Sequence, residues 1–439
     1  MVFKLFKRPN ILIMSLNIPD TKQKRMVVIG AGFAGLKLVR SLQGSPFQII
    51  LIDRNNFHQF QPLFYQVATA GLEPSAISFP LRKIFQKRKN LHIRLTEVVQ
   101  IDTENKVIKT LLGDLRYDVL VLATGATTNF FGMQQIAEAS LPMKTVGEAL
   151  NLRNTILKNY EAALTCDSIN EMESLLSIVI VGGGPTGVEL AGALAEMRTY
   201  VLPKDYPELN FREMKVYLVE ASSKLLSSMS EKASLGAYNF LEKLGVQIYT
   251  GVQVTGYQND QVLLHNGEHL NAHTLIWAAG VRGEYMEGIS EAHAGRGSRI
   301  IVNEFNQVIG LDSVYAIGDI ALMMSDAYPN GHPQVAQVAI QQAAALARNL
   351  TSRQKNNNWK AFHYLDKGAM ATIGRNKAVV DLPAIRFKGF FAWIIWMFVH
   401  LMSIVGTKNR LLIFINWLWN YLTYDQSLRL IIKPGKGNP

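Results

Sequence analysis

The sequence predicts an α/β protein in which a strand, a glycine-rich turn and a helix follow one another twice along the chain. Apolar strands at 26–29 and 177–181 each run into such a turn, and helical patterns follow at 36–42 and 188–197. The 439 residues also suffice for two or three domains. We therefore expect two Rossmann-like parallel sheets, followed by short C-terminal amphipathic helices.

The composition excludes several classes of protein. Hydrophobic residues make up 48% of the chain and charged residues 18%, which supplies a large core and excludes wholesale disorder. The single cysteine, Cys166, excludes a disulfide scaffold, a zinc ribbon and an intrachain dithiol redox centre, and no metal site is expected. The net charge of +11 suits an anionic partner such as nucleic acid, a membrane surface or a phosphate-bearing cofactor.

The first glycine-rich turn, GAGFAG at 30–35, has the surroundings that dinucleotide binding requires. It joins a strand to a helix, and a second strand at 47–52 ends in Asp53. The free N–H groups at the helix N-terminus favour a pyrophosphate there. Asp53 is placed to accept hydrogen bonds from ribose hydroxyls.

The three glycines of this turn have separate expected tasks. Gly30 makes the tight turn, Gly32 lets the backbone approach the pyrophosphate, and Gly35 lets the helix pack close to the strand. A glycine turn with a purely structural task is the alternative interpretation.

The whole unit then repeats. GGGPTG follows at 182–187, and the next strand, at 215–219, ends in Glu220. Two complete fingerprints in one chain are far more specific than one. Because carboxylates at Asp53 and Glu220 would repel a 2′-phosphate, the second fold suits NADH better than NADPH. The glycines at the equivalent positions are Gly182, Gly184 and Gly187.

Three further apolar strands end in a glycine turn, at 117–124, 275–279 and 314–317. Their order around two nucleotide folds fits places where a chain crosses between domains. A strand ending in Gly-Asp can also place a carboxylate near a sugar-like chain and phosphate. Taken singly, each segment is better explained as a plain strand and turn, and only their order around two nucleotide folds favours a functional role. The residues at these turns are Thr124, Gly125, Ala279, Gly280, Gly318 and Asp319.

The C-terminal region combines two apolar runs, 390–405 and 411–422, with basic flanks. Both runs are shorter than the roughly 20 residues that span a bilayer. Four of the six tryptophans lie in these runs. Indole rings prefer the headgroup level, so we expect two membrane-anchoring amphipathic helices that lie in the interface. A buried core hairpin and a single tilted spanning helix are the alternatives.

The domain boundaries follow from these segments. Residues 1–25 carry basic residues and a short apolar run without a cleavage site, which indicates a disordered extension and, less strongly, a targeting peptide. The expected divisions are this extension at 1–25, the first nucleotide domain at 26–145 and 278–384, the second at 146–277, and a membrane-association region at 385–439.

The order of glycine turns and acids resembles that of the flavoproteins with two dinucleotide-binding folds, over about residues 26–350. The resemblance implies that the first fold binds FAD non-covalently and that an inserted second fold binds NADH. Members of that superfamily differ in their electron acceptors, so the resemblance alone does not fix function. Disulfide reductases and sulfide:quinone reductases need paired cysteines beside the flavin, which this sequence lacks.

Three segments narrow the resemblance to the type II NADH:quinone oxidoreductases: AQVAIQ at 336–341, YLDKGAMATIGR at 364–375, and the apolar region at 389–420. This resemblance implies oxidation of NADH and two-electron reduction of menaquinone or ubiquinone through FAD, without proton pumping. It also implies a homodimer attached peripherally to the cytoplasmic face of the inner membrane, with the lipid surface as a partner and no nucleic acid. The competing interpretations are a soluble ferredoxin or rubredoxin reductase and a non-catalytic NADH-sensing protein.

The resemblance also assigns residues. Glu189, in the first turn of the second glycine helix, is expected near the nicotinamide and flavin, with a helix-capping acid as the alternative. Lys367 is expected to donate a proton near the quinone or flavin, with an ordinary turn lysine as the alternative. Gln337 and Gln341 share a helix face and are expected to hydrogen-bond the quinone carbonyl oxygens. The alternative is that they lie on the solvent-exposed face of an Ala-rich packing helix. The expected FAD residues are Gly30, Gly32, Gly35, Asp53, Thr124, Gly125, Gly318, Asp319, Ala336 and Gln337. The expected NADH residues are Gly182, Gly184, Gly187, Glu189, Glu220, Ala279 and Gly280.

Overall fold

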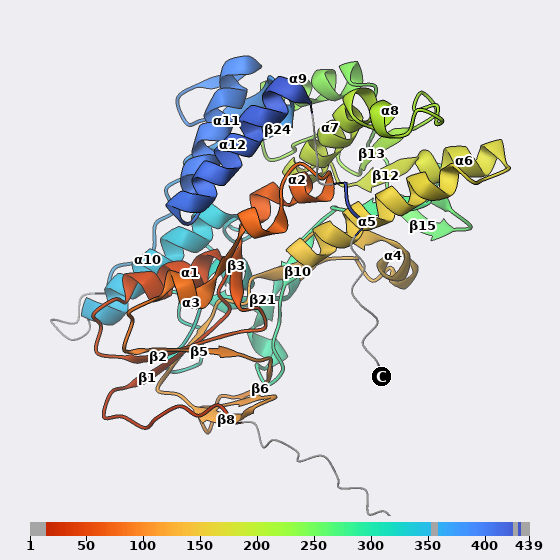
Figure 1. The fold of residues 1–439 in the computed structure, drawn as a ribbon. Helices are drawn as coiled ribbons and strands as arrows, with labels where there is room; N and C mark the ends of the chain where they lie inside the picture. Colours follow the sequence, from red (N-terminus) through yellow and green to blue (C-terminus); the bar gives the residue numbers. More distant parts are fainter. Residues whose placement is uncertain (1–14, 353–358, 425–428, 432–439) are drawn as a thin grey trace, which may run out of the picture. The chain divides into compact units, whose positions relative to one another are not determined.

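The computed structural model describes residues 15–352, 359–424 and 429–431. The chain forms two compact units (Figure 1). The first comprises the chain up to His58, Pro80–Ala126 and Gly283–Tyr364. The second comprises Gln59–Phe79, Thr127–Arg282 and the chain from Leu365 onwards. The domain boundaries expected from the sequence stay a prediction.

The first unit is built on a five-stranded parallel sheet in the order β22-β9-β1-β2-β5. Its central strands are nearly continuous apolar runs, which is typical of a parallel sheet covered on both faces. Helix α1 (Phe33–Ser41) follows β1 and packs against α10 (Ala336–Ser352). The strands are β1 (Arg25–Ile29), β2 (Gln48–Asp53), β5 (Leu91–Leu95), β9 (Val119–Leu122) and β22 (Val314–Ala316).

The second unit repeats this plan in the order β11-β18-β12-β13-β14, again parallel throughout. Helix α7 (Pro185–Tyr200) follows the glycine turn after β12. Helix α5 (Val146–Ala163) starts at a capping box formed by Thr145 and Glu148. The prediction of two Rossmann-like sheets is therefore confirmed. The strands are β11 (Leu141–Pro142), β12 (Ile178–Val181), β13 (Val216–Glu220), β14 (Gln247–Thr250) and β18 (Thr274–Trp277).

Smaller elements complete each unit. The first unit carries an antiparallel sheet of β6 (Val98–Asp102), β7 (Val107–Thr110) and β8 (Gly113–Arg116). The second carries one of β15 (Val254–Gln258), β16 (Gln261–Leu264) and β17 (His269–Asn271). The second unit also holds α2 (Phe64–Ala68), α6 (Ile169–Leu176) and α9 (Glu231–Lys243).

A third antiparallel sheet of the second unit brings the C-terminal segment against α7. It consists of β24 (Ala369–Gly374), β25 (Lys377–Asp381) and β26 (Arg386–Lys388). A Cβ atom at Gly192 would lie 2.2 Å from the carbonyl oxygen of Ile373, so α7 and β24 are in close contact only because residue 192 has no side chain. This contact positions one face of α7 beside β24.

The two C-terminal apolar runs form a helical hairpin of α11 (Phe390–Ser403) and α12 (Thr407–Thr423). The hairpin packs against β25 and buries Trp396 and Trp417, whereas Trp419 is exposed. The expectation that all four tryptophans serve the membrane interface is therefore wrong for these two, because their rings fill the interior of the unit. Among the helices that the structure describes, none is both long enough and apolar enough to cross a membrane.

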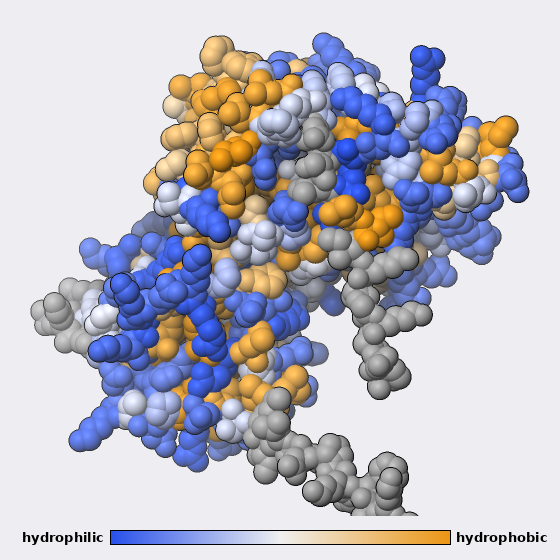
Figure 2. All heavy atoms as spheres, viewed as in Figure 1, coloured by the Kyte–Doolittle hydropathy of each residue, from blue (hydrophilic) through white to orange (hydrophobic). Residues whose placement is uncertain are grey.

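The outer face of the hairpin is apolar and exposed. Figure 2 shows a hydrophobic surface over α11 and α12. The alternative of a fully buried core hairpin is wrong, because only one face of each helix is covered. The exposed apolar residues are Phe390, Phe391, Ile394, Ile395, Phe398, Val399, Met402, Leu411, Leu412, Phe414, Ile415, Leu418, Trp419, Tyr421 and Leu422.

The end of the N-terminal extension is ordered, which differs from the disordered segment expected at 1–25. Leu16 is buried in the core of the first unit. The Arg94 guanidinium donates to the carbonyl oxygen of Asn17 at 2.6 Å, and the Gln48 amide donates to that of Pro19 at 2.6 Å. Long-range contacts of this kind leave no local signal in the sequence. Residues 1–14 lie outside the described part of the chain.

Candidate functional site

The first glycine of each fingerprint makes a tight turn against a neighbouring strand. Gly30 has φ +99° and Gly182 has φ +111°, which favour glycine. A Cβ atom at Gly30 would lie 2.3 Å from the carbonyl oxygen of Ala123, and one at Gly182 would lie 2.5 Å from that of Ala278. The backbone itself therefore requires glycine at both positions.

The second and third glycines differ in what they face. A Cβ atom at Gly35 or Gly187 would lie 1.9 Å from the carbonyl oxygen that opens its own turn, so helix and turn pack without a side chain. A Cβ atom at Gly32 or Gly184 would have no described heavy atom within 4 Å. Nothing in the described protein requires glycine at these two positions, and both lie at helix N-termini. They fit the close approach of a phosphate group.

The acids at the strand ends hold the glycine turns. Asp53 accepts hydrogen bonds from the backbone N–H groups of Ala31 at 2.7 Å and Asn55 at 2.6 Å. Glu220 accepts from Gly183 at 2.5 Å and Ser222 at 2.6 Å. Burial raises the pKa of Asp53, and these hydrogen bonds with the nearby Arg54 counter part of the rise. Besides the expected binding of ribose hydroxyls, Asp53 and Glu220 therefore hold the glycine turns in shape, a role that the sequence did not reveal.

The Gly-Asp turn of the first unit is held by a residue that the sequence analysis did not identify. A Cβ atom at Gly318 would lie 3.1 Å from the Cβ atom of Ala34 and 3.3 Å from that of Ala339. The Gly318 N–H donates to Gln342 Oε1 at 2.7 Å. Gln342 is fully buried, and its Nε2 has no hydrogen-bond partner in the described structure. An unpaired buried donor beside this turn is costly unless a ligand accepts from it, which fits a bound FAD.

The two expected cofactor sets separate between the units. All ten expected FAD residues lie in the first unit and all seven expected NADH residues lie in the second. Gln337 and Gln341 are half-buried on α10 in the first unit. Lys367 is exposed in the segment before β24 in the second unit and does not line the pocket described next. Their expected roles stay predictions.

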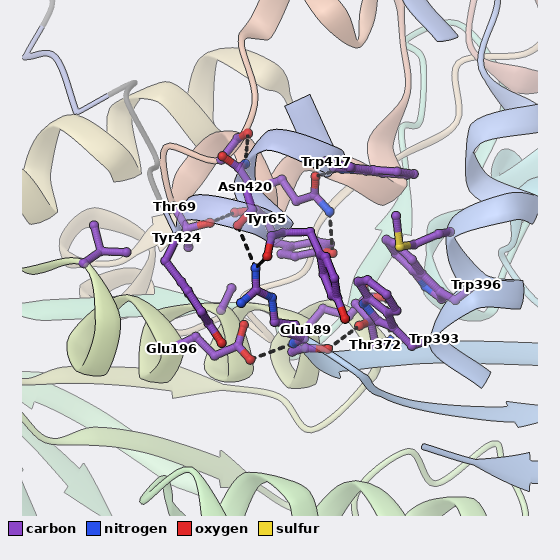
Figure 3. Close-up of a pocket in the computed structure, with 18 residues that line it drawn as sticks. Tyr65, Thr69, Glu189, Glu196, Thr372, Trp393, Trp396, Trp417, Asn420 and Tyr424 are labelled. Carbon is purple, nitrogen blue, oxygen red and sulfur yellow. Dashed lines mark hydrogen bonds between the residues drawn. The ribbon is translucent and has the colours of Figure 1, made fainter. Parts of the chain in front are cut away.

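A pocket of about 150 Å³ lies in the second unit where α7, β24 and the C-terminal hairpin meet. Figure 3 shows its lining, which combines aromatic rings with two carboxyl groups. The volume is enough for several water molecules. Side chains from segments far apart in the sequence line it, including Tyr65, Glu189, Glu196, Thr372, Arg375 and Trp396.

Glu189 is buried against β24 and faces this pocket. Its Oε1 accepts a weak hydrogen bond from the Thr372 backbone N–H at 3.4 Å. Burial raises the pKa of Glu189 to about 8, and the Thr372 N–H and the nearby Trp396 indole counter part of the rise. The Trp396 Nε1 completes no hydrogen bond within the described structure. Glu189 therefore holds a proton at neutral pH, which a simple helix-capping acid would not.

This burial makes a testable prediction about stability. In the unfolded chain Glu189 has its ordinary pKa of 4.5, whereas in the folded chain it keeps its proton up to about pH 8. The free energy of unfolding therefore falls as pH rises between these two values. The loss is on the order of a few kcal/mol. We expect the Tm of Glu189→Gln, relative to the parent, to improve as pH rises from about 5 to about 9. Calorimetry checks this, and a Tm difference that is constant with pH would contradict it.

Glu196 lies two helical turns beyond Glu189 on α7 and lines the same pocket. Its Oε1 accepts from the Arg375 backbone N–H at 2.6 Å. Burial raises the pKa of Glu196, while this hydrogen bond and the charges of Lys377 and Arg375 counter part of the rise. Residues seven apart share one face of a helix, so the spacing from Glu189 was the sequence signal that could have identified Glu196.

A series of hydrogen bonds leads from the hairpin to Tyr65. The Trp417 indole N–H donates to Gln66 Oε1 at 2.8 Å, and the Gln66 amide donates to the Tyr65 hydroxyl oxygen at 2.8 Å. Burial and the neighbouring Glu189 raise the pKa of Tyr65 well above its usual value. The hydroxyl therefore stays protonated and keeps its own proton to donate.

Polar side chains fix α12 to the segment around α2. Asn409 donates to the carbonyl oxygens of Ser75 at 3.1 Å and Ala76 at 3.0 Å, and Asn420 donates to that of Gly71 at 3.3 Å. At the end of α12 the Arg375 guanidinium donates to the Asn420 carbonyl oxygen at 2.8 Å. It also lies over the rings of Tyr421 and Tyr424, at 4.4 and 3.6 Å from their centroids. Arg375, Asn420, Tyr421 and Tyr424 also line the pocket.

His400, on α11, is half-buried, and its ring contacts the rings of Phe60 and Trp396. Its ring stacks on Trp396 with centroids 4.0 Å apart, and its Nδ1 lies 2.8 Å from the Trp396 carbonyl oxygen. Burial lowers the pKa of His400 to about 4, so its ring is neutral at physiological pH. It therefore adds no charge to this part of the unit.

Two family models cover most of the chain. One, described as pyridine nucleotide-disulphide oxidoreductase, matches residues 24–343, and the other, described as the NDH2 C-terminal domain, matches 367–424. The type II NADH:quinone oxidoreductase NdhA of Mycobacterium tuberculosis is 35% identical over 410 residues, which cover 90% of this chain and 86% of the relative. This chain belongs to the type II NADH:quinone oxidoreductase family. The resemblance found in the sequence is thereby confirmed, and the family activity is oxidation of NADH with reduction of a quinone through a flavin.

Solved structures share the fold. A structure of NDH2 from Plasmodium falciparum in complex with NADH has a TM-score of 0.86 at 21% identity and covers 94% of this chain and 100% of that chain. A ferredoxin reductase from Rhodopseudomonas palustris has a TM-score of 0.66 at 21% identity and covers 82% of this chain and 83% of that chain. The nucleotide folds alone do not separate the two classes. The NDH2 C-terminal match, which spans the hairpin, favours the type II NADH:quinone oxidoreductase family over the soluble reductase.

Proposed function

We propose that this chain binds FAD non-covalently in its first unit and NADH in its second, and passes two electrons from NADH to a quinone without pumping protons. The observation that carries the proposal is the pair of glycines, Gly32 and Gly184, whose side-chain positions are open at two helix N-termini. FAD would supply hydride acceptance from NADH and electron donation to the quinone. A homodimer on one membrane leaflet, at the cytoplasmic face, belongs to the same proposal.

The residues have separate tasks in this reaction. The two glycine turns bind pyrophosphate groups, and Asp53 and Glu220 hold those turns in shape while accepting from ribose hydroxyls. Gln337 and Gln341 bind the quinone carbonyl oxygens. Glu189 holds a proton at its buried carboxyl and delivers it to the site, because its pKa of about 8 keeps it protonated at neutral pH. Lys367 is the second proposed proton donor.

The assignments of Gln337 and Glu220 can be separated by steady-state kinetics. Gln337→Ala is expected to raise the KM for quinone severalfold and leave the KM for NADH nearly unchanged, since it removes a hydrogen bond worth about 1 kcal/mol. Glu220→Gln is expected to do the reverse, because its amide binds ribose hydroxyls less strongly and its single oxygen keeps only one of the two hydrogen bonds, from Gly183 and Ser222, that hold the turn. If both variants shift only the KM for NADH, the quinone assignment to Gln337 is wrong.

The exposed face of the hairpin is the proposed membrane-attachment surface. Basic residues outnumber acidic ones by seven to two over residues 381–439, which favours an anionic leaflet. The double variant Phe398→Glu, Leu418→Glu places charges on two exposed residues of this face and is expected to weaken binding to anionic vesicles at least tenfold. Vesicle co-sedimentation measures this. Ile169→Glu, on the exposed part of α6, is the matched control, and equal loss in both variants would contradict the assignment.

The soluble ferredoxin reductase is the weaker alternative. Such a protein would keep both nucleotide folds, but it would have no use for an apolar hairpin exposed on one face. A non-catalytic NADH-binding protein is weaker again, since it gives no reason to keep a protonated carboxyl beside the hairpin pocket.

A further inference from the structure

The pocket beside α7 offers a path to a carboxyl group that is otherwise enclosed. Glu189 is 8% exposed, and its neighbours on the pocket side are Thr372, Tyr65 and, two turns along the helix, Glu196. A volume of about 150 Å³ holds several waters, and the lining supplies carboxyl, hydroxyl and guanidinium groups to order them. Figure 3 shows Glu189 and Glu196 on the same side of this space.

The proposed reaction needs a proton from solvent in every turnover. NADH, one proton and a quinone give NAD⁺ and a quinol, so the hydride supplies both electrons and one proton, and solution supplies the other proton. A buried acid that gives up its proton must be reprotonated before the next turnover. Glu189 therefore requires a route to solvent if it takes the role assigned above.

We infer that Glu196 carries protons from solvent to Glu189 through water in this pocket, a step that rests on the proposed function. Glu189 releases its proton to a quinone oxygen and becomes a carboxylate. A pocket water then protonates Glu189, the Glu196 carboxyl replaces the proton on that water, and Glu196 takes a new proton from solvent. No electrons move in these steps, and each donor recovers its proton by the end of the cycle.

The groups that face Glu196 suit this task. Arg375 approaches from the turn after β24, Lys377 from the first position of β25, and Tyr65 from α2. On its own helix the nearest acid is Glu189, while the end of α12 contributes Tyr421 and Tyr424 to the pocket lining. Burial raises the pKa of Glu196 and the two cations oppose that rise, so the carboxyl exchanges protons closer to neutral pH than a surface glutamate does.

The variant Glu196→Gln tests this role, because its Oε1 can still accept from the Arg375 N–H while the amide has no acidic proton to transfer. We expect kcat for quinone reduction to fall about tenfold at pH 8, with a larger solvent deuterium isotope effect on kcat. The KM values for NADH and quinone, the flavin content and the anaerobic bleaching of the flavin by NADH should match the parent. Glu196→Asp should recover most of the rate. Glu242→Gln, an exposed acid on α9, is the matched control.

Several outcomes would overturn the inference. A parental kcat and isotope effect in Glu196→Gln would show that protons do not pass through Glu196. A raised KM for quinone with unchanged kcat would show that the pocket binds quinone instead. If Glu196→Gln and Glu196→Asp are equally slow and the isotope effect is parental, the role of Glu196 is structural. Failure of the proposed function is distinct from all of these, because the parent enzyme itself would then not reduce a quinone.

Discussion

Gly32→Val is expected to give a folded protein that contains no flavin. A Cβ atom at this position would meet no heavy atom of another described segment within 4 Å, so the fold leaves space where a side chain would begin. The same side chain would occupy the space through which a pyrophosphate approaches the N-terminus of α1. Far-ultraviolet circular dichroism should therefore match the parent, whereas the visible flavin absorbance of the purified protein should be absent.

Gly184→Val is the matched variant in the second unit. It should keep its flavin and its fold, yet NADH should no longer bleach the flavin, while dithionite still does. Gly35→Val is the opposing control, because its Cβ would lie 1.9 Å from the Gly30 carbonyl oxygen and should prevent folding. Retained flavin in Gly32→Val, or normal bleaching by NADH in Gly184→Val, would contradict the assignment of the two folds.

Glu189→Gln is expected to lower kcat for quinone reduction about a hundredfold, which is within the range for loss of a general acid. In the parent, kcat should fall as pH rises through about 8, because the Glu189 carboxyl then loses the proton it donates. The variant should be slow and lack this alkaline limb. NADH should still bleach its flavin. Stopped-flow measurements of each half-reaction across pH check both statements.

A different result would reassign the proton chemistry. If Glu189→Gln keeps the alkaline limb, Glu189 is not the group that gives rise to it, and the rate of Lys367→Met then tests the second proposed proton donor. If the variant fails to bleach with NADH but reduces quinone normally from a chemically reduced flavin, Glu189 positions NADH and does not donate a proton.

The sequence was sufficient to predict the two nucleotide folds, because their signals are local. A buried parallel strand is a short apolar run, and the turn after it needs glycine for reasons within six residues. Gly35 and Gly187 show this directly, since the carbonyl oxygen of the glycine five residues earlier excludes any side chain there. The acids at 53 and 220 were found by the same reasoning, although their hydrogen bonds to the turns were not.

The pocket could not be predicted, because its walls come from segments more than 100 residues apart. Tyr65 and Thr372 meet Glu189 only after α2, α7 and β24 have packed. Composition was also misleading for tryptophan: Trp396 and Trp417 were attributed to a lipid interface, yet they fill the interior beneath it. Gln342 was missed since its neighbour Gln341 carries the recognised motif, whereas Gln342 holds the Gly318 turn.

Anaerobic spectroscopy of the detergent-purified protein shows whether its flavin passes electrons from NADH to a quinone. NADH is added first while the flavin absorbance is followed, and a soluble quinone is added once the absorbance has settled. We expect rapid bleaching by NADH, followed by rapid return of the oxidised flavin on addition of quinone. Bleaching without return would contradict the claim that a quinone is the acceptor and would favour a carrier protein instead.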